Sequence, residues 1–326
     1  MKILQLIDSL GYHGNARQLQ LLAPALVSQG AAVEVCCLGP ETPWSASVRR
    51  AAIPVHALGW TRWLDVNVFL RLREIVRASS ADVIHVWGLP SLRALAAVAR
   101  DLLPRVLMNH LPDCTARVAW WDRALLGRVR CVNVAPGVIP QEKGPDSFSG
   151  GIACIGALER ENGFRFGIWA FDFLRFLYPD ARLRFVGAGS ELPTLRTLAI
   201  GLQSDAAIEF LGAQPEVADV VRDADVVWIP SQANTGRQVA LEAMAAGRPV
   251  IASDVPCLRE VIQDGVTGFL VPVGDVLHLA RCTKSLFDAP SLRQRLGAAA
   301  REFAQKHHSL ANIASRWRDH YQRVAA

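Results

Sequence analysis

Short apolar, β-branched runs alternate with amphipathic stretches along the whole chain. In the first part, the runs that predict strands are KILQLI, AVEVCCLG, IPVHALG, DVIHVWG, RVLMNH and RCVNVA. Between them, apolar residues recur at i, i+3 and i+4 in ARQLQLLAPALVSQG, VFLRLREIVRAS and PSLRALAAVARDLL, which predicts helices. Strands that are apolar throughout are typical of a parallel sheet covered by helices on both faces. The first part therefore predicts a doubly wound α/β domain.

The second part repeats this scheme. Its predicted strands are IACIGAL, ARLRFVGAG, AIEFLGA, ADVVWIPS, RPVIASD and GFLVPVG, and GFRFGIWAFDFLRFLY is a predicted helix. The segment PGVIPQEKGPDSFSGG lies between the two parts, is rich in Pro, Gly and Ser, and predicts a linker near residues 137–150. We expect domains over residues 1–140 and 141–308, with a last helix over 309–326. Because such sheets bind ligands outside the carboxyl ends of their strands, the prediction is a site in an inter-domain cleft.

Composition narrows the class of protein. A chain of 326 residues, 51% hydrophobic and 20% charged, fits two folded domains with cores of their own. The 35 basic and 30 acidic residues give a net charge of +5, with arginines spread through helices, which favours no nucleic-acid partner but permits peripheral contact with an anionic membrane. The seven cysteines form no C-x-x-C pair and no apolar run reaches 18 residues. These features predict a cytoplasmic protein, with the inner membrane face as a surface it can contact.

A glycine-bearing loop, DSLGYHGNARQ, follows the first predicted strand. Gly11 and Gly14 allow the backbone to approach a ligand, and the helix that begins there offers free N–H groups to an anion. The spacing differs from the G-x-G-x-x-G fingerprint, which disfavours a nicotinamide cofactor. A tight turn without a ligand is the alternative.

Two histidines stand at predicted strand ends, His85 in VIHVWG and His110 in LMNHLPD. A histidine that faces the cleft could orient a hydroxyl or carry a proton near neutral pH. A hydrogen-bonded structural histidine is the alternative at each position.

Cations for a phosphate group are available after the first strand of the second domain. Arg160 lies in IGALERENGF and Arg165 directly follows that segment. A departing pyrophosphate needs such charges because its own charge grows as it leaves. Solvated surface arginines are the alternative reading.

Glycines end two further predicted strands, in FVGAGSE and FLGAQPEV. Gly187, Gly189 and Gly212 would let the main chain pass close to a ribose or base, and the backbone near Glu216 and Val217 could read a nucleobase edge. Ordinary turn glycines are the alternative.

The strand ADVVWIPS, the polar loop QANTG and the helix RQVALEAMAAG form the last candidate. The first N–H groups of this helix could hold a diphosphate; they belong to Gly236, Arg237, Gln238 and Val239. Glu242, about one turn into the helix, could accept two hydrogen bonds from a ribose diol. An acid favoured by the helix macrodipole is the alternative.

Together these motifs resemble the retaining glycosyltransferases of family 4, which have the two-domain GT-B fold. The most specific part is ALEAMAAGRPVIASDVPCLREVIQDGVTGFLVPVGD, supported by ILQLIDSLG, ADVIHVWG, RFVGAGSE and ADVVWIPS in the same order. The resemblance implies two Rossmann-like domains that face each other across a cleft. It further implies a C-terminal domain that binds a nucleotide-sugar of the UDP or GDP class, an N-terminal domain that binds the acceptor, and a last helix that crosses back to the N-terminal domain.

The resemblance also implies roles for particular residues. Glu242 matches the second glutamate of the family's E-x7-E motif, which holds the ribose. Gly14 matches the glycine loop near the donor phosphates, and His110 matches a histidine near the reacting sugar.

Three positions depart from the family pattern. Asn234 replaces the first glutamate of E-x7-E, and Ala157 and Asn162 replace the arginine and lysine that hold the diphosphate. Two lost charge-assisted contacts would weaken donor binding by roughly two to four decades. Three nearby cations could substitute: Arg160, Arg165 and Arg237.

The sequence thus predicts a glycosyltransferase of saccharide or lipid biosynthesis that needs no cofactor or metal. It would move a sugar with retention of configuration to a hydroxyl group of an acceptor that the sequence does not identify, with His110 and Asn234 beside the reacting sugar. A non-catalytic nucleotide- or sugar-binding scaffold of the same fold is the alternative, because the phosphate-binding residues differ. A nucleotide-sugar epimerase of this architecture is a third reading, for which the cleft offers few carboxylates and histidines.

Overall fold

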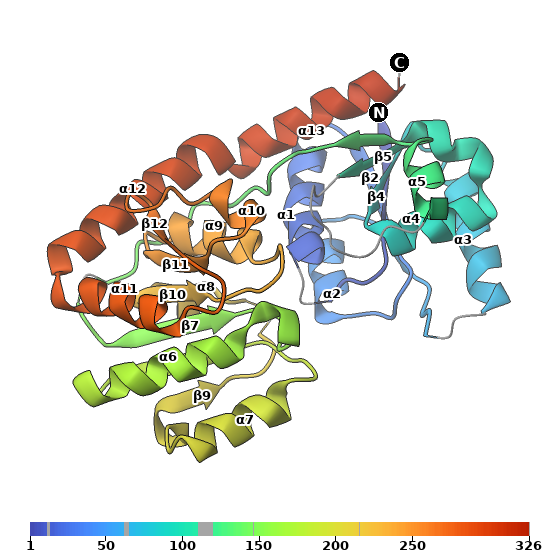
Figure 1. Cartoon of the computed structure of the whole chain (residues 1–326). Coiled ribbons are helices and arrows are strands. Elements are labelled where there is room, and N and C mark those ends of the chain that lie inside the picture. The colour runs from blue at the N-terminus through green and yellow to red at the C-terminus, as the bar shows by residue number, and fades with distance from the viewer. Residues whose placement is uncertain (12–13, 62–64, 110–119, 146, 215, 326) are drawn as a thin grey trace. The chain divides into compact units, whose positions relative to one another are not determined.

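The computed structural model describes the chain except residues 12–13, 62–64, 110–119, 146, 215 and 326, and of Trp120 and Trp121 it describes the backbone alone (Figure 1). The chain divides into two compact units. Unit 1 contains Met1–Gly137 and Leu310–Ala326, and unit 2 contains Val138–Ser309.

Unit 1 is built on a six-stranded parallel sheet with the order β3-β2-β1-β4-β5-β6. Its strands are β1 (Lys2–Ile7), β2 (Ala32–Cys37), β3 (Val55–Ala57), β4 (Val83–Trp87), β5 (Val106–Asn109) and β6 (Arg130–Val132). β1 lies at the centre, with Ile3 opposite Val33 on one side and Val83 on the other. This order is that of the dinucleotide-binding fold, and it places a topological switch point between β1 and β4.

Helices cover both faces of this sheet. They are α1 (Gly14–Ser28), α2 (Pro43–Arg50), α3 (Val66–Ala78), α4 (Leu89–Val98), the 3₁₀ helix η1 (Arg100–Arg105) and α5 (Trp120–Leu126). Alternate residues of a strand enter opposite cores. Ile3 packs with residues of α1 and α2, whereas Leu4 packs with residues of α3 and α4.

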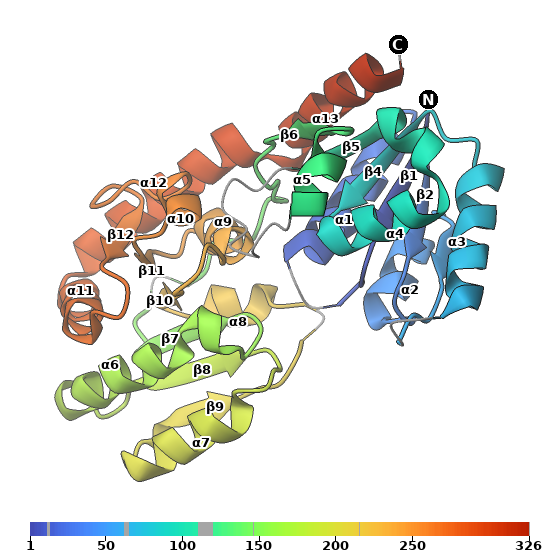
Figure 2. The same ribbon diagram turned by 45° about the vertical axis from the view of Figure 1, so that its right-hand side comes forward.

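The last helix, α13 (Leu310–Ala325), belongs to unit 1 (Figure 2). Ile313, Trp317 and Tyr321 recur every four residues and are buried in the same core as α1. The helix contacts α1, β4 and β5. The expectation that the last helix packs on the first domain is confirmed.

Of the two readings of His85, the structure supports the hydrogen-bonded structural histidine, because the side chain does not face a ligand site. The side chain is fully buried inside β4, two residues before the strand ends. It lies between the rings of Trp87 and Trp317, each with its centroid 4.3 Å away. Desolvation in this aromatic cage lowers the pKa of His85 to about 3. His85 is therefore a neutral core residue on the side of the sheet that α13 covers.

Unit 2 repeats the architecture with the order β12-β11-β10-β7-β8-β9, all parallel. Its strands are β7 (Gly151–Ile155), β8 (Arg182–Val186), β9 (Ile208–Phe210), β10 (Val226–Ile229), β11 (Val250–Ser253) and β12 (Gly268–Val271). The two sheets confirm the predicted pair of doubly wound α/β domains.

The helical segments of unit 2 are η2 (Arg160–Asn162), α6 (Phe164–Leu177), α7 (Leu192–Gly201), η3 (Asp205–Ala207), α8 (Ala218–Asp223), α9 (Arg237–Ala245), α10 (Pro256–Arg259), α11 (Val276–Asp288) and α12 (Pro290–His308). One core joins α6, α7 and α11 to the sheet, and a second joins α8, α9, α10 and α12 to the opposite face. Helix α9 is buried on almost every side, so its start is held rigidly at the carboxyl ends of the strands.

Candidate functional site

The candidate site lies at the switch point of unit 2, between the neighbouring strands β7 and β10. From β7 the chain proceeds to β8 on one side, and β10 begins the run of strands on the other side. In open α/β sheets, the crevice outside the carboxyl ends at this point is where ligands bind. The loops that follow the two strands, residues 156–163 and 230–236, therefore form the floor of the candidate site.

A network of polar side chains ties these two loops together. The Thr235 hydroxyl donates to the side-chain oxygen of Asn162 at 2.7 Å, and the amide nitrogen of Asn162 donates to the Ala157 carbonyl at 2.8 Å. The Ser231 and Thr235 hydroxyls are 2.7 Å apart. Gln232 adds a main-chain bond of 2.8 Å to the Glu161 carbonyl. Asn162 thus fixes the shape of both loops.

Two of the predicted glycines are required by the geometry of the site. Gly187, directly after β8, has φ +146°, and a Cβ there would lie 1.8 Å from the Gly156 carbonyl oxygen. Gly236 has φ +91° and caps α9, and a Cβ there would lie 2.4 Å from the Ile229 side chain. Gly187 lets two backbones come closer than any other residue permits, and Gly236 has a positive φ and lies against the Ile229 side chain.

The start of α9 has no side-chain cap. Gly236 is the N-cap and makes no side-chain hydrogen bond, and the predicted residues Arg237, Gln238 and Val239 form the first turn. The first N–H groups of a helix have no partner within it and carry the positive end of its dipole. The arrangement suits a diphosphate.

Glu242 lies one turn further along α9 and is buried, with 8% of its surface exposed. Its Oε1 accepts a hydrogen bond of 2.9 Å from Nε2 of Gln238. The helix therefore presents a carboxylate and an amide close together, and both groups can bond to hydroxyls.

Two of the three candidate cations are already engaged by acids. Arg165 pairs with Glu191 at 2.6 Å, and the buried Arg237 pairs with Glu260. Arg160 in η2 is exposed, and its carbonyl accepts a bond of 2.8 Å from Gln232. Of the three, Arg160 is the one that the loop network places in solvent at the site.

Asn234 has a structural bond of its own. Its side-chain oxygen accepts a hydrogen bond of 2.6 Å from the Cys257 amide, in the first turn of α10. The asparagine therefore joins the loop after β10 to the segment after β11, a link that leaves its amide nitrogen as a donor.

The remaining predicted residues lie elsewhere. Val217 is half-buried at the start of α8. The loop after β9 reaches the site through the Gly212 carbonyl, which accepts a hydrogen bond of 2.8 Å from the Gly187 amide. Gly14 begins α1 in unit 1. His110 lies outside the described residues.

The loop network was not among the sequence predictions. Ser231 ended the predicted strand ADVVWIPS, and Thr235 belonged to the polar loop QANTG, whose only signal was its position after that strand. The partners of both residues come from a segment 70 or more residues earlier.

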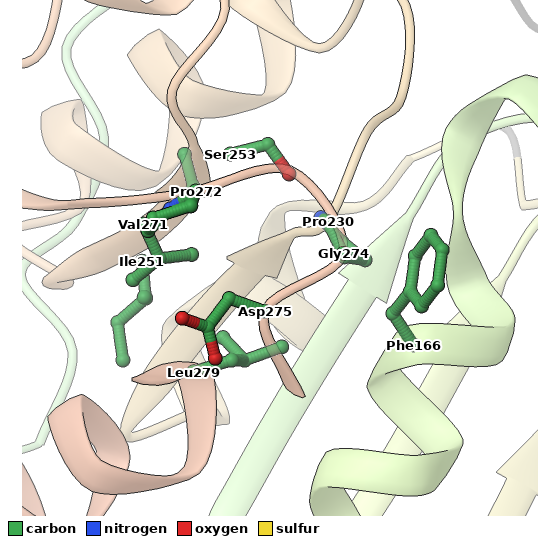
Figure 3. Close-up of a pocket in the computed structure, with 10 residues that line it drawn as sticks. Phe166, Pro230, Ile251, Ser253, Val271, Pro272, Gly274, Asp275 and Leu279 are labelled. Atoms are coloured by element: carbon green, nitrogen blue, oxygen red, sulfur yellow. The ribbon is translucent and has the colours of Figure 1, made fainter. Parts of the chain in front are cut away.

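A small pocket in the same unit also escaped prediction (Figure 3). Its lining includes Phe166, Pro230, Ser253 and Asp275, and its volume is about 10 Å³. Such a space accommodates about one water molecule and is too small for a sugar. It lies beside the candidate site as a packing feature.

Two observations concern other kinds of site. Over the described residues, no group of three or more His, Cys, Asp or Glu side chains is placed to hold a metal ion. Over the same part of the chain, no helix is long and apolar enough to cross a membrane.

Known proteins resemble both units. Residues 149–289 match the family described as Glycosyl transferases group 1, and residues 12–136 match Glycosyltransferase Family 4. The chain is 38% identical, over an alignment of 361 residues, to the phosphatidyl-myo-inositol mannosyltransferase of Mycobacterium leprae, and the alignment covers 99% of this chain and 92% of that protein.

Other relatives match in part. The N-acetyl-alpha-D-glucosaminyl L-malate synthase of Bacillus anthracis is 34% identical over 145 residues, which are 44% of this chain and 38% of that protein. The matched segment thus spans little more than a third of that relative. Among solved structures, Anabaena HepE in complex with UDP-glucose has a TM-score of 0.84 at 17% identity, covering 99% of this chain and all of that one. This structural likeness shows the GT-B fold. The family matches and the near full-length relative show that the chain belongs to the group 1 glycosyltransferases of family 4.

Proposed function

We propose that the protein transfers a sugar from a nucleotide-sugar to a hydroxyl group of a saccharide, lipid or other acceptor, with retention of configuration. Unit 2 would hold the donor and unit 1 the acceptor. The observation that carries the proposal is the start of α9 at the switch point, where a helix N-terminus without a side-chain cap stands one turn from the buried Glu242. Family 4 members use nucleotide-sugar donors, which is consistent with this pairing of an anion site and a diol acceptor.

In this proposal each group has one task. The α9 N–H groups and Arg160 bind the diphosphate, Glu242 binds the ribose diol, and the backbone at Val217 contacts the base. Gly14 approaches the phosphates from unit 1. His110 and Asn234 orient the donor sugar.

The proposed reaction breaks the bond between the anomeric carbon and the phosphate oxygen. The acceptor oxygen forms its bond to the anomeric carbon on the face that the diphosphate leaves, and the acceptor proton passes to the departing phosphate oxygen. The helix dipole and the N–H groups stabilise the charge that grows on the diphosphate. No cofactor or metal enters this scheme.

The first experiment is thermal unfolding with UDP, GDP and their sugars. A ligand at 100 times its dissociation constant adds about 2.7 kcal/mol of stability. We expect a shift with one nucleoside diphosphate and its sugars, UDP being the first candidate because HepE was solved with UDP-glucose. Transfer to saccharide and lipid acceptors is then followed with the donor so identified. Absence of any shift at millimolar ligand would contradict donor binding in unit 2.

A second function, donor binding without transfer, is favoured by one observation. Arg165 and Arg237 are held by acids, and Asn162 is committed to the loop network, so that the cationic character of the site is reduced. Asn162→Lys and Asn234→Glu separate the two functions. An enzyme adapted to its donor should lose its own transfer activity in both variants, whereas a binding protein has no turnover to lose and should gain affinity for the donor diphosphate.

A further inference from the structure

Helix α6 carries an apolar stripe on the side that faces away from the sheet. Trp169, Phe173, Phe176 and Leu177 recur at spacings of three and four and so share one side of the helix. They are 38%, 51%, 71% and 59% exposed, respectively. We call these four residues the aromatic stripe.

The aromatic stripe is unusual because α6 is already anchored by its other side. Phe164, Ile168, Phe171 and Leu174 are buried in the core of unit 2. A surface helix ordinarily directs polar residues to solvent, and a helix that is apolar all round needs cover on both sides. The described residues of unit 2 leave the stripe exposed, so it is available to a partner from outside this unit.

Cationic side chains border the aromatic stripe. The Arg175 guanidinium carbon lies 4.4 Å from the centroid of the Phe176 ring, and the same guanidinium pairs with Asp172 at 2.8 Å, which balances its charge. Helix α11 packs along α6 and adds Leu277, 51% exposed, with the exposed Arg281 one turn further on. Aromatic and aliphatic groups flanked by long cationic side chains match the boundary between lipid headgroups and acyl chains. The guanidinium groups would remain at the level of the phosphates.

We propose that the aromatic stripe of α6 docks on the surface of a bilayer that contains anionic lipid, with the helix lying parallel to the membrane plane. The charge of Arg281 is complementary to such a surface, which attracts cationic side chains near it. The inference concerns the location of the protein, and it holds or fails independently of the proposed transfer reaction.

A second copy of the chain is the competing occupant, and the area of the stripe argues against it. Given its partial exposure, the stripe offers on the order of 400 Å² of apolar surface. A stable protein interface buries about 800 Å² on each partner. The stripe alone is too small for a stable dimer, whereas a reversible membrane contact needs only a modest apolar insertion assisted by charge.

The test is co-sedimentation of the full chain, without donor, with vesicles of phosphatidylcholine alone and of phosphatidylcholine mixed with phosphatidylglycerol. The variant is the double substitution Phe173→Ser and Phe176→Ser, which alters two exposed side chains. The matched control is Val66→Ser with Leu70→Ser on α3, whose side chains are 68% and 58% exposed. Thermal unfolding verifies that both variants fold.

We expect the wild type to bind the mixed vesicles and the control to bind like the wild type. The stripe variant should bind these vesicles with an affinity roughly tenfold or more below that of the wild type. Arg281→Gln should lower binding to mixed vesicles and leave binding to phosphatidylcholine unchanged. The proposal is overturned if the wild type stays in solution with both vesicles, or if the stripe variant binds as well as the control. It is also overturned if the wild type is a dimer without lipid and the stripe variant a monomer, because a second copy would then cover the stripe.

Discussion

The Nδ1 atom of His85 on β4 lies 2.7 Å from the hydroxyl oxygen of Tyr321 on α13, although 236 positions separate the two residues. Nε2 of Gln5 donates to the same hydroxyl at 3.3 Å, which directs the tyrosine proton towards His85. Burial raises the pKa of Tyr321, so the hydroxyl remains a donor at any pH at which the protein is folded. This buried chain of bonds fastens the last helix to the central strands of unit 1.

The cage around His85 should make unit 1 sensitive to acid. The pKa of His85 falls from its ordinary value of 6.5 to about 3 on burial, so the unfolded chain takes up a proton that the folded chain refuses. The neutral, buried His85 contributes fully to the free energy of unfolding above pH 6.5. This contribution is lost as the pH falls towards 3, at no more than about 1.4 kcal/mol per pH unit. Urea unfolding of the wild type and of His85→Phe between these pH values measures the difference. Equal pH dependence of the two proteins would contradict this assignment.

Tyr321→Phe should destabilise unit 1 by about 1–3 kcal/mol, since Nδ1 of His85 loses its buried partner. Tyr178→Phe is the matched control. That tyrosine bonds to Asp288 at the surface of unit 2, and its loss should change the unfolding free energy by less than about 0.5 kcal/mol. Chemical denaturation measures both variants. If Tyr321→Phe lowers the free energy of unfolding no more than Tyr178→Phe does, the buried hydrogen bond contributes nothing to stability.

Gly187→Ala should destabilise unit 2 by about 3 kcal/mol and weaken donor binding, because the new methyl group collides with the Gly156 carbonyl at the edge of the site. Gly201→Ala at the end of α7 has no atom within 4 Å of the added carbon and should be neutral or stabilising by up to about 1 kcal/mol. Calorimetric unfolding, with and without the nucleotide found by the ligand screen, compares them. If both alanines prove equally harmless, the close approach of the two loops is not required.

Glu242→Gln should lower the affinity for the donor nucleotide by about tenfold to a hundredfold, because it removes the charge from the hydrogen bonds to the ribose. The matched substitution Glu209→Gln lies on β9, where the glutamate pairs with Arg184 at the surface, and should leave affinity unchanged. Isothermal titration with the nucleoside diphosphate gives both values. Retention of full affinity in Glu242→Gln would remove the ribose role from this residue.

The sequence was sufficient for the architecture because its strands are buried on both faces and therefore read as continuous apolar runs. KILQLI and ADVVWIPS became β1 and β10 for this reason. The sequence left two readings of His85 open, because a polar residue near the end of such a run can face a ligand or lie in the core. The residues that enclose it, Trp317 and Tyr321, come from the far end of the chain, and no local pattern indicates them.

The candidate site was predictable in its backbone features and less so in its charges. Gly187 directly follows β8 and Gly236 directly precedes α9, and a glycine at either kind of place is a local signal. The acids that engage Arg165 and Arg237, namely Glu191 and Glu260, lie 26 and 23 positions away, and only the fold brings each pair together. Residue type alone therefore overstated the number of cations available to a phosphate.

The position of α13 has a consequence for biosynthesis. Residues 138–309 fold as one continuous unit, so unit 2 can complete its core as soon as that segment has left the ribosome. Unit 1 emerges first but waits for Trp317 and Tyr321, which fill its core from the last helix. Pairings across so long a stretch of chain form slowly and leave apolar surface exposed in the meantime. We therefore expect the half of the protein that is synthesised first to finish folding last, and its nascent form to be the state in which chaperone assistance matters most.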